Sequence, residues 1–387
     1  MTEIEWKALI KTGAVNQKGD TWYPTKETME AEGYIREHVK AGKPLVKEEL
    51  LKMRQYFRPV MISLIECKNI LLDGVTFQNS PAWNNHPLMC ENMIIRNVNF
   101  RNPWYSQNGD GIDVESSKNV LIYNCTFDVG DDALCMKSGI DEEGRKRGIP
   151  TENIVIADCI VFHGHGGFTI GSEMSGGVKN IKVSNCNFLG TDIGLRFKST
   201  RGRGGVVENI YINNIYMKDI PTDAISFNMY YGGAAPTEEV SADDQIKDSK
   251  PVEVNDGTPK FRKIYLDSIY CNGARNAVVL QGLPEMPISE IELNNIVMKA
   301  DKAISLIDAD GVKISNAKIS SSDPVVRIMQ SKNVSFDHLE SMNENKLFMK
   351  LDGEKTGNIV IRGIDQSKIK DKIEFGKGVA GSAITIQ

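Results

Sequence analysis

The sequence lacks the features that mark membrane-spanning and nucleic-acid-binding proteins. No apolar run approaches the roughly 18 residues that a transmembrane helix requires, and no basic stretch dominates the chain. The formal net charge is −5, so the protein as a whole offers an acidic ligand no attraction. We therefore expect no membrane insertion and no nucleic-acid partner, and an acidic substrate would need a local cluster of Arg and Lys.

Cysteine pairing and metal-binding motifs are also missing. The seven cysteines are an odd number, and no two of them stand in a CxxC arrangement. Most lie inside apolar segments, where a free thiol packs like a small hydrophobic side chain. The sequence therefore predicts buried free thiols, and we expect no metal and no cofactor.

No linker rich in Pro, Gly or Ser divides the 387 residues into separate domains. Helical patterns within residues 1–57, such as that over 44–56, predict an N-terminal cap segment. Residues 58–387 are predicted to form one domain, in which the polar stretch 232–260 forms a long loop. The first residues also lack the basic and apolar regions of a signal peptide.

A short repeat is the dominant feature of the sequence. Each copy holds two strand-like runs separated by Asn, Asp or Gly, residue types that tolerate the left-handed backbone conformation of a sharp bend. A leucine-rich repeat would need a Leu ladder, and a propeller blade would be longer. Units of this size bury a face only by stacking, so the repeat predicts an all-β, right-handed parallel β-helix. Six copies begin 23 to 34 residues apart, at Asn69, Asn92, Asn119, Asn153, Asn180 and Asn209.

Three consecutive repeats carry polar clusters just before an apolar strand, and a fourth carries two cations. If the apolar pairs point inward, Asp131 and His165 share one register, and Asp110 and Asp132 share another. Neighbouring coils lie about 4.8 Å apart, so these groups should form one patch on the outward face. The motifs are Asn108-Gly109-Asp110, Gly130-Asp131-Asp132, Gly164-His165-Gly166 and Arg196-Phe197-Lys198.

Such a patch has the composition of a glycoside-cleaving site. Crowded carboxylates repel one another, so the pKa of at least one should rise and that group should stay protonated. A protonated carboxyl beside an ionised one can donate a proton to the leaving oxygen while the other activates water. Arg196 and Lys198 suit the carboxylate of a uronic acid. Each motif alone also fits an ordinary turn or a solvated face, and only their common register favours a site.

The order of these four motifs resembles the signature of the polygalacturonase family, glycoside hydrolase family 28, and in particular its bacterial exo-acting members. This resemblance implies a hydrolase that cleaves α-1,4-linked galacturonic acid in pectin with inversion of configuration. Asp131 would be the general acid, Asp110 and Asp132 would hold and deprotonate the attacking water, and His165 would position the acid.

The resemblance also implies a set of substrate-binding residues. Asn108 comes from the first motif and Arg196 and Lys198 from the last, while an aromatic residue one coil further on would be Tyr230 or Tyr231. Trp83 is a further stacking candidate, although core packing explains it equally well. Gly109 stands where many family members have Thr, and the segment 171–177 is similar to exo-acting bacterial members.

Other functions remain open at this point. One is a rhamnogalacturonan or xylogalacturonan hydrolase of the same family. Another is a calcium-dependent pectate-lyase-like eliminase, in which the aspartates bind calcium and Arg196 or Lys198 is the base; a third is a non-catalytic glycan-binding β-helix. The expected partner is a pectic oligo- or polysaccharide that contains galacturonate, and we expect the protein to be a monomer. Because polymeric pectin cannot enter a cell, we expect a secreted or periplasmic protein.

Overall fold

The computed structural model describes residues 2–232, 250–364, 369 and 372–387. It contains two compact units, Met1–Val60 and Met61–Gln387, which we describe separately. Among the described residues, no helix is both long enough and apolar enough to cross a bilayer. Of the predicted loop 232–260, residues 233–249 lie outside the described part of the chain.

The first unit consists of short helices and a two-stranded antiparallel sheet. Thr2 and Glu5 form a capping box at the start of the first helix, and Thr25 caps the second, because these side chains satisfy amides that lack helical partners. The helical pattern over residues 44–56 corresponds to the last two elements. The elements are α1 (Glu3–Leu9), β1 (Ala14–Val15), β2 (Trp22–Tyr23), α2 (Lys26–Lys40), α3 (Lys47–Lys52) and a 3-10 helix, Arg54–Tyr56.

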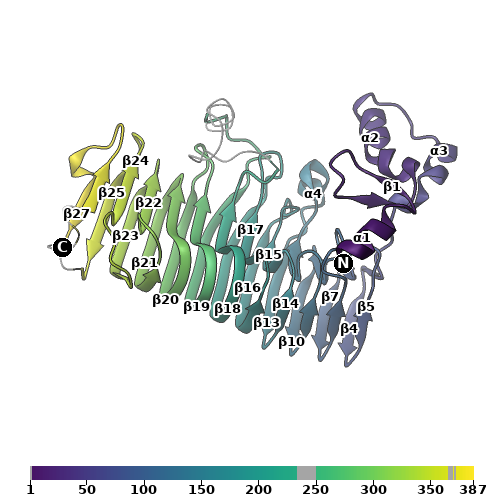
Figure 1. Cartoon of the computed structure of the whole chain (residues 1–387), viewed down its shortest axis with the longest axis horizontal. Helices are drawn as coiled ribbons and strands as arrows, with labels where there is room; N and C mark the ends of the chain where they lie inside the picture. Colours follow the sequence, from purple (N-terminus) through teal and green to yellow (C-terminus); the bar gives the residue numbers. More distant parts are fainter. Residues whose placement is uncertain (1, 233–249, 365–368, 370–371) are drawn as a thin grey trace. The chain divides into compact units, whose positions relative to one another are not determined.

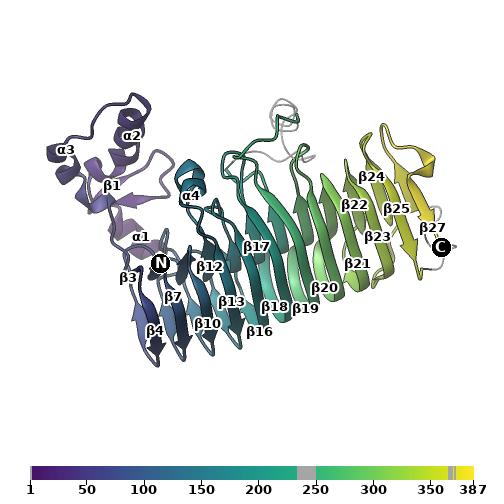
Figure 2. The same cartoon turned by 180° about the vertical axis from the view of Figure 1, so that it is seen from behind.

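The second unit is a parallel β-helix, which confirms the predicted fold (Figures 1 and 2). Each coil contributes to three faces, and each strand pairs in parallel with the coils before and after it. The first face contains β4 (Lys68–Asp73), β7 (Glu91–Arg96), β10 (Lys118–Tyr123), β13 (Thr151–Ala157), the first parts of β16 (Val178–Leu189), β18 (Val206–Asn228), β19 (Lys260–Gln281), β20 (Ile288–Ile307), β21 (Ala309–Ser320) and β23 (Lys332–Ser341), and then β25 (Gly357–Arg362) and β27 (Ile384–Ile386).

The second face is short, and the third face carries the site described below. The second face contains β5 (Thr76–Gln78), β8 (Asn99–Arg101), β11 (Thr126–Asp128), β14 (Ile160–His163) and the later parts of β16, β18, β19, β20, β21 and β23. The third face contains β3 (Ile62–Ile65), β6 (Asn85–Leu88), β9 (Ile112–Glu115), β12 (Leu134–Lys137), β15 (Gly166–Ile170), β17 (Ile193–Lys198), the last parts of β18, β19 and β20, and then β22 (Val326–Met329), β24 (Met349–Asp352) and β26 (Ile373–Phe375). Helix α4 (Asp141–Arg147) follows β12, and a 3-10 helix, Gly381–Ala383, precedes β27.

The bends between the first and second faces have the left-handed conformation that the repeat predicts. Gly74 has φ 69°, and Asn97 and Asn124 have φ 56° and 52°. The leading asparagines of the repeat also have positive φ, and their side chains form a ladder between coils. In this ladder Asn119 Nδ2 donates to Asn92 Oδ1 at 3.1 Å. These hydrogen bonds link each bend to the next and favour the regular stacking of the coils.

Stacked apolar side chains fill the interior of the second unit. Cys125, Cys159 and Cys186 form the predicted inward stack and are buried free thiols. Phe100 and Phe127 stack with their ring centroids 4.7 Å apart. Each coil buries its apolar side chains only against the neighbouring coils. The hydrophobic contribution to stability is therefore distributed along the whole stack.

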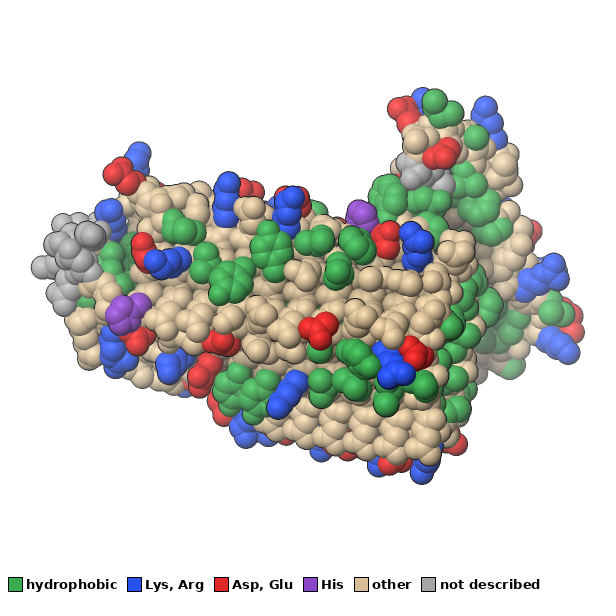
Figure 3. Space-filling model, turned by 90° about the horizontal axis from the view of Figure 1, so that it is seen from below, with side chains coloured by type: hydrophobic (Ala, Val, Ile, Leu, Met, Phe, Trp, Pro, Cys, Tyr) green, Lys and Arg blue, Asp and Glu red, His purple; other side chains and the backbone are tan. Residues whose placement is uncertain are grey.

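Outward positions are not uniformly polar. Leu71, Ile94, Val155 and Tyr211 are exposed on the first face and belong to one register row across neighbouring coils. Figure 3 shows hydrophobic side chains among charged ones on one side of the molecule. Single exposed apolar residues are common on protein surfaces, and we assign no function to this row.

Candidate functional site

The predicted acidic residues lie at the start of neighbouring strands of the third face. Pairing of β9 with β12 places Asp110 beside Asp132 on the adjacent coil. One coil further, the amide of His165 donates to the carbonyl of Asp131 at 2.9 Å. These contacts reproduce both predicted registers, because residues at equal positions in a parallel stack become spatial neighbours.

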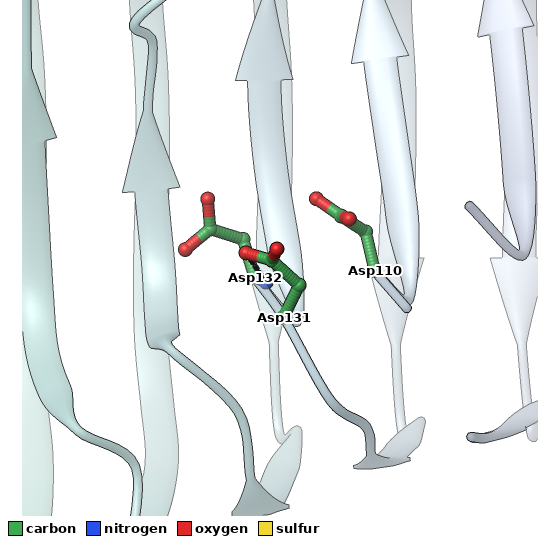
Figure 4. A group of neighbouring side chains, drawn as sticks. All are labelled: Asp110, Asp131 and Asp132. Carbon is green, nitrogen blue, oxygen red and sulfur yellow. Dashed lines mark hydrogen bonds between the residues drawn. The ribbon is translucent and has the colours of Figure 1, made fainter. Parts of the chain in front are cut away.

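The three aspartates form a compact cluster (Figure 4). One carboxylate oxygen from each of Asp110, Asp131 and Asp132 lies within 4.8 Å of the others. Asp110 and Asp132 are only 3% and 1% exposed, whereas 19% of the Asp131 side chain is accessible. Asp131 is therefore the carboxyl of the cluster that is best placed to touch a bound molecule.

Asp132 is held as a buried carboxylate by two cations and a hydroxyl group. Its Oδ1 accepts hydrogen bonds from Arg196 and from Thr169 Oγ1, both at 3.0 Å, and its Oδ2 accepts one from Lys198 at 2.7 Å. Burial favours the neutral acid, but Lys198 and Arg196 outweigh it and hold the pKa of Asp132 far below its usual range. Gly166 leaves the room for this arrangement, because a Cβ there would lie only 2.7 Å from Asp132 Oδ1.

The two cations are therefore not open to solvent as the sequence suggested. Arg196 and Lys198 do point outward from the apolar core, but both side chains are largely buried and contact Asp132. The two cations therefore hold Asp132 in place, and an acidic ligand bound here would compete with Asp132 for their charge.

Crowding of carboxylates predicts that one of them has a raised pKa, and in the structure this carboxyl is Asp110. Burial is the largest cause of this shift, and the negative charges of Asp113 and Asp131 add to it. Among the described residues, no group donates a hydrogen bond to Asp110 Oδ1. Burial also raises the pKa of Asp113 to about 6, although Lys137 opposes the shift. Asp110 is thus protonated over a wider pH range than an exposed Asp.

Replacing Asp110 should stabilise the fold at neutral pH. The pKa of Asp110 is raised in the folded state, so the folded protein binds this proton more tightly than the unfolded chain. Stability is therefore lost as pH rises above the unfolded pKa of about 3.9. We expect Asp110→Asn to increase the free energy of unfolding by about 1 kcal/mol or more at pH 8 and by less at pH 4. Denaturant unfolding at the two pH values measures this. The exposed Asp219→Asn serves as the control, and an equal gain at both pH values would contradict the electrostatic explanation.

His165 lies between two carboxylates, one of which the sequence analysis missed. Its Nδ1 is 3.4 Å from Asp131 and its Nε2 is 3.6 Å from Asp192. The hydrogen bond to Asp131 is the main reason that the pKa of His165 is raised. Asp192 follows Gly190 and Thr191 in the next coil, and its position one coil beyond His165 was the signal that could have identified it.

A second buried ion pair, also missed, lies two coils before Arg196 and Lys198. Lys137 Nζ lies 3.1 Å from Asp113 and 3.6 Å from Glu173. It also lies 3.9 Å from the ring centroid of Trp83, so Trp83 borders this part of the third face rather than packing only in the core. The signal was the outward position of Lys137 in β12, directly after the inward-facing Met136.

The two aromatic candidates have different environments. Tyr230 is 4% exposed and belongs to the hydrophobic core, so little of its side chain is open to a ligand, and its role as a substrate contact stays a prediction. Tyr231 is 40% exposed, and the Lys198 ammonium lies 4.9 Å from its ring centroid. The chain leaves β18 at Asn228, and the turn that follows buries Tyr230 and leaves Tyr231 exposed beside the cations, which the sequence alone did not decide.

The first motif forms the edge of the site. Asn108 is exposed and adopts a left-handed conformation, with φ 53°. At Gly109, a Cβ would overlap Ser106, whose hydroxyl group donates to the carbonyl of Pro103 at 2.7 Å. The close approach of Ser106 therefore explains why this chain has glycine at a position where many members of the family have threonine.

Comparisons with known proteins agree with this fold and residue pattern. Residues 47–274 match the family described as "Glycosyl hydrolases family 28". A protein of Vitis vinifera named "Probable polygalacturonase" is 31% identical over 245 residues, which are 63% of this chain and 47% of that protein. The exo-poly-alpha-D-galacturonosidase of Dickeya chrysanthemi is 29% identical over 177 residues, 45% of this chain and 29% of that protein.

A solved structure gives the same result. The crystal structure of a hyperthermoactive exopolygalacturonase from Thermotoga maritima has a TM-score of 0.58 and 31% sequence identity to this chain, covering 80% of this chain and 62% of that one. The chain spans about half the length or less of the first curated relatives it matches, 47%, 48% and 29%. Because the family match covers more than half of the residues and includes the acid cluster, the chain belongs to glycosyl hydrolases family 28.

Proposed function

We propose that the protein hydrolyses α-1,4-linked galacturonic acid in pectin. The observation that carries this proposal is the cluster of Asp110, Asp131 and Asp132, in which one buried carboxylate is neutralised by Arg196 and Lys198. Acidic and anionic carboxyls side by side suit hydrolysis of a glycosidic bond, and the adjacent cations suit a uronate. The names of the family relatives support the same substrate class.

The roles of the three acids follow from their exposure and charge. Asp131 is accessible and contacts His165, so it donates the proton to the leaving oxygen. Asp132 stays ionised and, together with Asp110 once Asp110 has lost its own proton, holds the attacking water and takes up its proton. His165, between Asp131 and Asp192, positions the acid. Arg196, Lys198 and Tyr231 contact the uronate, with Asn108 and Trp83 at the border of the site.

Water rather than a carboxylate is the nucleophile in this scheme. The close spacing of the acids would by itself suggest retention. However, Asp132 is buried with both oxygens engaged, and Asp110 is buried with a raised pKa, so neither is suited to attack the sugar directly. We therefore expect inversion: proton NMR during the first turnovers should show a β-anomer released from the α-linked substrate. An initial α-anomer would contradict this mechanism.

We further propose that cleavage is exo. Two observations support this mode. Residues 171–177 are similar to exo-acting members of the family, and the similar structure from Thermotoga maritima is that of an exopolygalacturonase. We expect the viscosity of polygalacturonate to fall slowly relative to the reducing ends released, with monomer or dimer as the early product. A steep initial drop in viscosity would show endo cleavage and overturn this part of the proposal.

The proposed reaction is tested by incubating the protein with polygalacturonate and with a rhamnogalacturonan backbone, followed by product-size analysis. Preference for the second substrate would identify a rhamnogalacturonan hydrolase instead. Ultraviolet-absorbing unsaturated products that disappear with EDTA would identify a calcium-dependent eliminase, to which the clustered aspartates could contribute ligands. Binding without turnover, unchanged in Asp131→Asn, would identify a glycan-binding protein.

The cellular setting follows from the proposed substrate. Because a pectic polymer cannot cross a membrane intact, we propose that the protein acts outside the cytoplasm, as a secreted or periplasmic enzyme. Cell fractionation tests the location. We also propose that it acts as a monomer, since the acid cluster and its cations all come from one chain. Light scattering at working concentration tests the oligomeric state.

A further inference from the structure

Two cysteines occupy equivalent positions on the first two coils of the β-helix. Cys67 lies in the bend between β3 and β4, and Cys90 lies in the bend between β6 and β7. Strands β4 and β7 pair in parallel, with Lys68 opposite Glu91 directly after the two cysteines. Cys67 and Cys90 are therefore one strand spacing apart, about 4.8 Å between their Cα atoms. This separation lies within the range of roughly 4.4 to 6.8 Å that a disulfide requires.

The thiols of Cys67 and Cys90 lie in contact. The two side chains are hydrogen-bonded to each other, and both thiols are free. Both sulfur atoms also lie beside the same strand of the first coil, β3. Cys67 Sγ donates to the carbonyl of Ile65 at 3.4 Å, and Cys90 Sγ donates to the carbonyl of Leu64 at 3.3 Å. Joining the sulfur atoms therefore requires rotation of side chains rather than a rearrangement of the coils.

This pair differs from the other cysteines in its access to solvent. Cys67 is half-buried, whereas the other six cysteines are buried. The row of Cys125, Cys159 and Cys186 also brings thiols together, but these side chains are no more than 1% exposed and lie beyond the reach of an oxidant. Cys67 is therefore the thiol at which oxidation can begin.

We propose that Cys67 and Cys90 form a disulfide in an oxidising compartment and so join the first coil of the β-helix to the second. The electrons pass to a small-molecule disulfide such as oxidised glutathione. The Cys67 thiolate attacks this disulfide and releases one glutathione thiol, which leaves a mixed disulfide on Cys67. The Cys90 thiol then gives its proton to solvent and attacks Cys67 Sγ, and the second glutathione leaves and is protonated. Two protein thiols and one glutathione disulfide thus become one protein disulfide and two glutathione thiols.

The disulfide fastens the least buried coil of the stack. Ile70 and Leu72 of β4 are only half-buried, whereas Met93 and Ile95 at the paired positions of β7 are buried. Among the described residues, β3, β4 and β5 have parallel partners on one side only. An end coil of this kind opens more readily than the coils inside the stack. The crosslink closes a loop in the opened state, which lowers the entropy of that state and disfavours opening.

Oxidation of the purified full chain tests this inference. The protein is incubated with oxidised glutathione and unfolded, its free thiols are counted, and its peptides are mapped by mass spectrometry. We expect five free thiols, two fewer than the seven of the reduced protein, and a crosslinked peptide pair that carries Cys67 and Cys90. Amide hydrogen exchange in β3, β4 and β5 should slow about tenfold or more on oxidation, while exchange in the interior strand β13 stays unchanged.

Two variants and a matched control separate the crosslink from other reactions. Cys90→Ala should stop at a glutathione adduct on Cys67, and Cys67→Ser, a change at a half-buried position, should form no adduct; neither should show the slowed exchange. The control, Cys271→Ala, removes a buried thiol from β19 and should keep the crosslink. Seven free thiols after oxidation, a stable adduct on Cys67 in the wild type, or a crosslink between two molecules would overturn the proposal. Equal exchange in the reduced and oxidised proteins would overturn the fastening of the first coil. These measurements do not depend on hydrolysis, so they stand whether or not the proposed function holds.

Discussion

Asp131→Asn is expected to lower turnover of polygalacturonate about 10²- to 10⁴-fold, because it removes the proposed proton donor to the leaving oxygen. Asn is nearly isosteric with Asp, and Asp131 lies in the loop before β12 with its side chain partly accessible, so the core should be unaffected. Substrate binding should persist, since Arg196, Lys198 and Tyr231 are unchanged. Single-turnover kinetics and calorimetric binding of an oligogalacturonate measure the two effects separately.

Asp128→Asn provides the matched control for this variant. Asp128 lies on the same coil, in β11 of the second face, where its side chain is exposed and contacts His163. It should keep wild-type turnover. If Asp131→Asn retained more than about a tenth of wild-type turnover, above what loss of acid catalysis permits, Asp131 would not be the acid. The buried Asp110, with its raised pKa, would then be the next candidate.

Lys198→Met is expected to destabilise the fold by roughly 3 kcal/mol at neutral pH, because among the described residues it leaves the buried Asp132 carboxylate in direct ion-pair contact with Arg196 alone. The folded-state pKa of Asp132 is depressed, and Lys198 is the largest cause that lowers it. The stability that this provides is present above the unfolded pKa of about 3.9 and is lost as pH falls toward the folded value. The difference between wild type and Lys198→Met should therefore be large at pH 7 and smaller at pH 3.

Denaturant unfolding at both pH values measures this effect, with Lys182→Met as the control. Lys182 is exposed on the first face, so its loss should change stability by no more than about 0.5 kcal/mol. A Lys198→Met protein as stable as the wild type at pH 7 would show that Arg196 and Thr169 suffice to hold the carboxylate. A destabilisation independent of pH would indicate lost packing rather than lost charge pairing.

The repeat made the architecture predictable because it acts at the level of single residues. Asn, Asp or Gly at each bend permits positive φ, and alternation between the bends separates inward from outward side chains. From those two facts follow the parallel stacking, the inward row of Cys125, Cys159 and Cys186, and the registers that bring Asp110 to Asp132 and Asp131 to His165. The family resemblance, confirmed by the comparisons, added the expected roles.

Properties that depend on contacts between coils could not be predicted in the same way. The sequence could not show that Asp132 takes both Arg196 and Lys198, because those contacts span 64 and 66 residues. Likewise, Tyr230 and Tyr231 are adjacent in sequence, and only the three-dimensional packing shows that Tyr230 is buried in the core and Tyr231 is exposed. The pKa shift on Asp110 arises from burial and from neighbouring charges, neither of which a residue type specifies.

The sequence by itself thus determined the β-helix, the register of the acids and the family, because a repeat encodes backbone conformation and side-chain direction locally. The tertiary structure alone decided which carboxyl is buried with a raised pKa, which is buried against two cations with a lowered pKa, and which is accessible. It also placed Asp192 beside His165 and Lys137 beside Asp113. Burial and charge pairing are sums over all surrounding atoms, so they exist only once the coils are stacked.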